Sequence, residues 1–91
     1  MIGTARLQLH LPSCHSLKEK RSVLRRFMEH IRRTYGAAIA EVDAQDRWQM
    51  AILEVAVVSN ERAHLHKMLT KIIDDADAPG EMILTDSEIE V

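Results

Sequence analysis

The sequence predicts an α+β domain in which two helices cover one face of a four-stranded antiparallel sheet. The chain has 91 residues, which is enough for one domain with a single core between two layers of secondary structure. Alternating and helical apolar patterns follow one another in the order βαββαβ. Each helical segment carries a single apolar stripe, so both helices are expected to cover the same face of the sheet.

The first strand and the first helix have clear boundaries. Residues 2–11 alternate as a half-buried strand does. Its buried side holds Leu7, Leu9 and Leu11. Pro12 ends the strand because it cannot donate to a sheet, and Ser16 with Glu19 forms a capping box that begins a helix, which Gly36 ends. Placed at about 100° per residue, the core face of this helix consists of Leu17, Leu24, Phe27, Met28, Ile31 and Tyr35.

Two strands are expected after this helix. In residues 37–43, alternation places Ala38, Ala40 and Val42 on the core side and Ile39, Glu41 and Asp43 on the other. After a turn, residues 47–58 form the longest and most apolar strand. Its core side holds Leu53, Val55 and Val57, opposite Glu54. A slip of one residue in the shorter strand would exchange its two sides, because successive side chains point to opposite faces.

The remaining elements complete the fold. Asn60 can cap a helix over residues 61–76. The apolar arc of this helix collects Leu65, Met68, Leu69, Ile72, Ile73 and Ala76. Pro79 and Gly80 precede a last strand over residues 82–91. This strand places Ile89 and Val91 opposite Glu88 and Glu90. Right-handed connections put the first and third strands at the centre, which is a ferredoxin-like, two-layer domain spanning the whole chain.

Composition excludes several classes of protein. Hydrophobic residues make up 46% and charged residues 29%, which is typical of a globular protein and not of a disordered one. There is no apolar run long enough for a membrane span and no signal-peptide pattern, so we expect a cytoplasmic protein with no membrane partner. The single cysteine, Cys14, forms no internal disulfide and no multi-cysteine zinc site, which agrees with a reducing compartment.

The net charge of −2 averages two regions of opposite sign. Residues 16–33 carry seven basic and two acidic residues, whereas residues 74–91 carry seven acidic residues and no basic one. An arc of about 60° beside the core face of the first helix contains Lys18, Arg21, Arg25 and Arg32, here called the basic stripe. Such a stripe suits a nucleic-acid backbone, and Lys20, Arg26 and Arg33 add weaker support. The alternative is a solvated face, or a face attracted to the acidic C-terminal region.

The sheet face that no helix covers is a second candidate surface. It is expected to present Ile39, Trp48, Met50 and Ile52. A lone tryptophan with three aliphatic side chains on an uncovered face indicates a partner surface. A homodimer that buries this face is the simplest explanation.

Catalytic and metal-binding sites have little support. Glu41, Asp43 and Asp46 could bind a hard cation or a small ligand, together with His10, but such carboxylates more often pair with a neighbouring arginine. Cys14 lies in a turn with no second cysteine, and the three glycines are isolated, so no phosphate loop is present. We therefore expect a protein that is not an enzyme and that uses no cofactor and no metal.

Three stretches carry a family resemblance. Residues 15–22 read HSLKEKRS, residues 40–49 read AEVDAQDRWQ, and residues 57–60 read VVSN. Together they closely resemble the YlxP-like family of small bacterial proteins of unknown function. The resemblance implies a ferredoxin-like fold, a cytosolic location, and genes that often lie beside those for ribosome-binding factor A and a translation initiation factor. It implies no activity, because the family brings no established catalytic residue, cofactor or ligand.

These observations favour one function and leave two alternatives open. The leading hypothesis is a non-enzymatic accessory protein of ribosome maturation or translation, which docks on ribosomal RNA or a ribosomal protein through the basic stripe. The second is a homodimeric interaction module that uses the open sheet face. The third is a small-ligand or metal binder at Glu41, Asp43 and Asp46.

Overall fold

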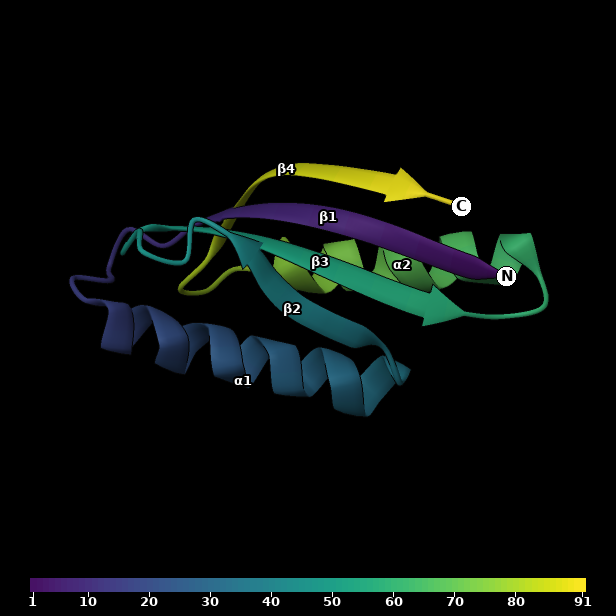
Figure 1. The fold of residues 1–91 in the computed structure, drawn as a ribbon, viewed down its shortest axis with the longest axis horizontal. Coiled ribbons are helices and arrows are strands. Elements are labelled where there is room, and N and C mark those ends of the chain that lie inside the picture. Colours follow the sequence, from purple (N-terminus) through teal and green to yellow (C-terminus); the bar gives the residue numbers. More distant parts are fainter.

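The computed structural model describes residues 1–91 and confirms the βαββαβ order (Figure 1). The elements are β1 (Ile2–His10), α1 (Leu17–Tyr35), β2 (Ala38–Asp43), β3 (Met50–Val58), α2 (Arg62–Ala76) and β4 (Ile83–Glu90). The strands form one sheet in the order β2-β3-β1-β4, and every neighbouring pair is antiparallel. The first and third strands are central, as predicted, and the arrangement is ferredoxin-like.

Both helices lie beneath one face of the sheet (Figure 1), and the core fills the space between the two layers. The central strands contribute Leu7, Leu9, Leu53, Val55 and Val57. The helices contribute Val23, Leu24, Phe27, Ile31, Leu65, Leu69 and Ile72. Gly3 lets α2 approach β1 closely, because a Cβ at this position would lie 3.0 Å from Leu69 Cδ1. Neither helix combines the length and the apolar character that a membrane-spanning segment requires.

The capping signals of α1 are confirmed. Ser16 Oγ accepts a hydrogen bond from the Glu19 N–H at 3.1 Å, and Glu19 Oε2 accepts one from the His15 N–H at 2.9 Å. Gly36 has a φ of 63°, and its N–H donates to the Arg32 carbonyl at 3.0 Å. The sequence therefore fixes both ends of this helix.

The start of α2 differs from the prediction. Asn60 is not the N-cap residue; Glu61 takes that position without a side-chain hydrogen bond, and the helix begins at Arg62. The hydroxyl group of Ser59 accepts a hydrogen bond from the Glu61 N–H at 3.2 Å, which places a turn just before the helix. The helix boundary is consequently one residue later than expected.

The predicted register of β2 is wrong by one residue. Ile39 pairs with Val55 and faces the core with 5% of its surface exposed, whereas Ala38 and Ala40 are exposed on the open face. Burying isoleucine removes more apolar surface from water than burying alanine, so this register is favoured. The pairing shifts after Glu41, and this irregularity leaves Val42 exposed.

The third and fourth strands are shorter than expected. β3 begins at Met50, so Trp48 lies in the β2–β3 loop (residues 44–49) instead of on the sheet. β4 ends at Glu90, and Ile89 lies opposite Ala5 on the core side, as predicted. A register shift in β4 falls opposite Gln8.

Candidate nucleic-acid interface

The basic stripe lies on the flank of α1 that borders β2. Three of its residues, Arg21, Arg25 and Arg32, line one open hollow of about 360 Å³. The rest of the hollow is formed by Leu24, Met28, Glu29 and Glu41. Lys18 is exposed one turn before Arg21. The fold therefore keeps the four cations on one side of a rigid helix.

Three of these cations have no partner within the chain. Lys18, Arg21 and Arg25 are exposed and form no ion pair. Arg32 donates from Nη2 to the Ile39 carbonyl oxygen at 2.8 Å, which holds its guanidinium group against β2. Guanidinium and ammonium groups without carboxylate partners can each bind a phosphate group.

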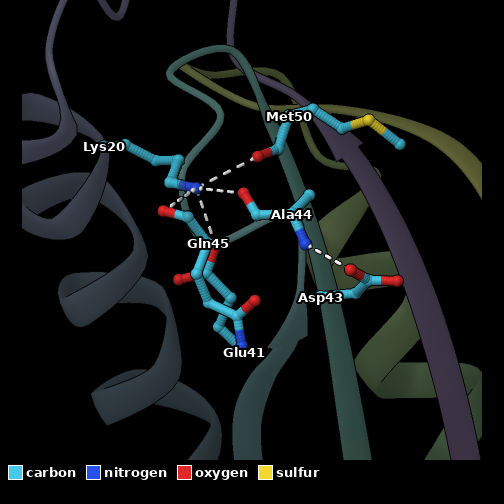
Figure 2. A network of polar contacts seen from close by, with 6 residues as sticks. All are labelled: Lys20, Glu41, Asp43, Ala44, Gln45 and Met50. Carbon is cyan, nitrogen blue, oxygen red and sulfur yellow. Dashed lines mark hydrogen bonds and ion pairs between the residues drawn. The ribbon is translucent and has the colours of Figure 1, made fainter.

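Lys20 is not part of this surface, and its predicted supporting role is wrong. Its side chain is fully buried, and Figure 2 shows it reaching from α1 to the β2–β3 loop. The Lys20 Nζ atom donates to Glu41 Oε2 at 2.8 Å and to the carbonyl oxygens of Ala44, Met50 and Gln45 at 2.9, 3.2 and 3.3 Å. Burial of an ammonium group requires such partners, so this charge is committed to the fold.

The spacing in the sequence contains a signal for this network. Lys20 follows Leu17 by three residues and precedes Leu24 by four, so it occupies a position in the apolar row of the helix. A lysine in such a row indicates a buried cation with an acidic partner. Counting it only as a positive charge missed this role.

The other two supporting cations have different surroundings. Arg26 Nη2 pairs with Glu81 Oε1 at 2.6 Å, which neutralises its charge. Arg33 is exposed and forms no ion pair. Of the three supporting cations, only Arg33 therefore keeps a free charge at the surface.

The three carboxylates considered for a metal or a small ligand do not form a common site. Glu41 is bound by Lys20. Asp43 Oδ1 accepts a hydrogen bond at 2.7 Å from the Ala44 N–H, at a residue with a φ of 58°. No group of three or more His, Cys, Asp or Glu side chains is placed to hold a metal ion. The carboxylate of Glu41 thus serves the buried network.

The surroundings of Cys14 and His10 also favour a structural role for these two side chains. Cys14 is buried, and its burial raises the pKa of the thiol, with repulsion from Glu19 and Glu81 acting in the same direction. A raised pKa disfavours the thiolate that nucleophilic chemistry requires. His10 Nδ1 lies 3.0 Å from the Gln49 carbonyl oxygen, which anchors the end of β1 to the β2–β3 loop.

A cluster between the helices was not predicted. The Tyr35 hydroxyl group donates to Asp75 Oδ2 at 2.6 Å, and His30 Nε2 lies 3.0 Å from the same oxygen. Burial, followed by the hydrogen bond and charge of Asp75, raises the pKa of Tyr35 to about 12. These residues are 40 and 45 positions apart from Asp75, so no local pattern could have indicated that they meet.

The predicted apolar patch on the open sheet face does not exist as a unit. Ile39 faces the core, and Ile52 faces outward but is only 8% exposed. Ile52 lies at the base of a small hollow of about 130 Å³ that polar side chains surround. They are Arg6, Gln8, Asp86 and Glu88. Trp48 is 54% exposed on the loop, and Met50 is half-buried.

Charge separates between the two layers of the molecule. The helices together carry ten basic and four acidic residues, whereas the four strands carry one basic and six acidic residues. Both helices lie on one face of the sheet (Figure 1), so the helical layer has an excess of positive charge and the strand layer an excess of negative charge. The two contributions nearly cancel, so the small net charge of the chain does not reveal this separation.

Known proteins similar to this chain support the resemblance noted in its sequence. Residues 2–89 match a family model described as a protein of unknown function (DUF503). The uncharacterized protein YlxP of Bacillus subtilis (strain 168) is 33% identical over 78 residues, covering 86% of this chain and 85% of that protein. A de novo designed protein with a ferredoxin fold covers 100% of this chain and 86% of its own at a TM-score of 0.57 and 9% identity, a likeness of fold alone. The chain therefore belongs to the YlxP-like family of proteins of unknown function (DUF503).

Proposed function

We propose that this protein is a non-enzymatic cytoplasmic accessory factor that docks on structured RNA of the ribosome through its basic stripe. The observation that carries the proposal is the presence of three exposed, unpaired cations, Lys18, Arg21 and Arg25, along one rigid helix. Each phosphate contact adds affinity without reading the base sequence. Selectivity then comes from the shape of the RNA.

The two charged layers set the orientation of this docking. The helical face attracts the phosphate backbone, and the strand layer, with six acidic residues, is repelled by it. Arg21 and Arg25 line the same hollow between α1 and β2, so both can contact one segment of the RNA backbone. RNA therefore approaches the helices and leaves the open sheet face free.

Co-sedimentation with ribosomal subunits from a bacterial extract tests the proposal. At low salt the protein should migrate with one subunit, and raised salt should release it, because counterions compete for the phosphates. Arg21→Glu combined with Arg25→Glu should abolish co-migration while circular dichroism shows an intact fold, since both side chains are exposed.

A matched control distinguishes binding through the basic stripe from an effect of net charge alone. Arg47→Glu combined with Arg62→Glu changes the net charge equally, and both residues are exposed, unpaired and outside α1. This variant should keep most of its binding. A protein that stays at the top of the gradient at every salt concentration, or equal losses in the two variants, would argue against docking through the basic stripe.

A second candidate function is self-association at the edge of the sheet formed by β2. It is supported by the exposed side chains of Val42, in the edge strand β2, and of Trp48, in the β2–β3 loop. Trp48→Lys should then convert a dimer into a soluble monomer. A wild-type protein that sediments as a monomer at high concentration would exclude this candidate.

A further inference from the structure

A second basic hollow lies between the last turn of α1 and one face of α2. Its volume is about 500 Å³, which is within the usual range for small-ligand sites. Its lining consists of Thr34, Tyr35, His64, Lys67, Met68 and Lys71. It shares no residue with the hollow beside the basic stripe. The fold therefore contains a second place where an anion can be held.

Spacing on α2 brings His64 and two lysines to one side of this hollow. His64, Lys67 and Lys71 are three and four residues apart, so they follow one face of the helix. Both lysines are exposed and form no ion pair. No carboxylate lines the hollow, and Asp75, one turn beyond Lys71, is occupied by Tyr35 and His30. The site thus offers two uncompensated positive charges.

The other part of the lining is apolar and aromatic. The hydroxyl group of Tyr35 is held by Asp75 at 2.6 Å, which fixes the position of the ring. Met68, four residues after His64, adds a thioether that packs well against aromatic rings. A flat apolar surface beside two cations suits a ligand with an aromatic ring and a phosphate group.

We propose that this hollow binds a nucleotide, with its phosphate on Lys67 and Lys71 and its base against Tyr35 and Met68. The nucleotide can be a free mononucleotide or one unit of a single-stranded RNA, since both have the same ring and phosphate. This proposal does not rest on the docking of the basic stripe, because no residue is common to the two surfaces.

Titration of the isotope-labelled chain by NMR tests the proposal. Adenosine monophosphate should shift the resonances of the lining residues, whereas adenosine and inorganic phosphate should each bind about tenfold more weakly because each lacks one of the two contacts. Lys67→Gln combined with Lys71→Gln should weaken binding by at least about tenfold. Tyr35→Leu should remove the preference for the nucleotide over inorganic phosphate.

Two controls and one comparison complete this test. Arg62→Gln, on the opposite side of α2, and the Arg21→Glu/Arg25→Glu variant should bind adenosine monophosphate as the natural chain does. Oligoadenylate that binds more tightly than the mononucleotide identifies RNA as the source of the ligand, and the reverse order identifies a free nucleotide. Absence of shifts at the lining residues, or unchanged binding by the double lysine variant, would overturn the proposal.

Discussion

The buried ammonium group of Lys20 links three segments that are distant in the sequence. It reaches from α1 to Glu41 in β2, to the β2–β3 loop, and to Met50 at the start of β3. The spacing of the helix could indicate that Lys20 is buried, but not which oxygens surround it. Those acceptors come from a loop whose backbone conformation depends on the completed sheet, so local pattern cannot predict them.

Replacing Lys20 with methionine should lower the free energy of unfolding by about 2–4 kcal/mol, because Glu41 and three carbonyl oxygens lose their donor. Urea unfolding followed by the fluorescence of Trp48, the single tryptophan, measures this change. Lys18→Met is the matched control, since Lys18 is exposed and unpaired, and its effect should stay within about 0.5 kcal/mol. Equal effects of the two substitutions would contradict the buried network.

Tyr35 should titrate at a pH well above the ordinary value of 10.0, with a pKa of about 12. It is the only tyrosine, so the absorbance of tyrosinate reports on it alone. Because the folded pKa is the higher one, its contribution to stability is complete below pH 10.0 and is lost as the pH rises toward 12.

Asp75→Asn separates the causes of this shift. The substitution removes the negative charge beside the hydroxyl group but leaves the burial of the ring, so the pKa of Tyr35 should fall and still remain above 10.0. A native chain whose tyrosine titrates at its ordinary pH would show that the contact with Asp75 is not formed.

At the level of elements, the prediction was correct where the apolar pattern was long and fitted only one arrangement of the segment. The 19-residue helix α1 has many apolar positions and caps at both ends, and its bounds are correct. The six-residue strand β2 contains three alanine or valine residues on one side and one isoleucine on the other, so alternation alone fits both registers. Packing against β3 decides between them, and this information is not local.

The corrected register of β2 has a direct test. Ile39→Ala should reduce the free energy of unfolding by about 2–4 kcal/mol, because it leaves a cavity in the core. Val42→Ala should cost less than about 1 kcal/mol, because Val42 is exposed at the irregularity of the strand. Urea unfolding of both variants measures the two effects. The register predicted from alternation requires the opposite order, so a larger effect at Val42 would restore it.

For the whole molecule, the sequence predicted the topology and the basic stripe but not the separation of charge between layers. That separation needs both helices on one face and a negative β4 at one edge of the sheet, and it persists although Lys20, one of the ten basic helical residues, is buried. On the open sheet face, by contrast, the sequence predicted a surface feature that the structure does not contain. Its predicted apolar patch required Ile39 and Trp48 to lie on the same surface, and register and strand length moved both residues elsewhere.

Docking through the basic stripe should have a defined dependence on salt. If Lys18, Arg21 and Arg25 each bind one phosphate, the logarithm of the association constant should fall against the logarithm of salt concentration with a slope of about −2 to −3. Arg21→Gln combined with Arg25→Gln should make this slope shallower by about 1.4 to 1.8, because two counterions are no longer released. Fluorescence anisotropy of a labelled, structured ribosomal RNA fragment measures both slopes.

A double substitution in the strand layer is the control for this salt dependence. Glu88→Gln combined with Glu90→Gln also changes the net charge by two, but on the edge strand β4 instead of α1. Charges farther from the RNA than a Debye length of about 8–10 Å are largely screened, so this variant should keep the slope of the natural chain. A slope altered by the glutamate substitutions and unaltered by the arginine substitutions would mean that RNA approaches the sheet and not the helices.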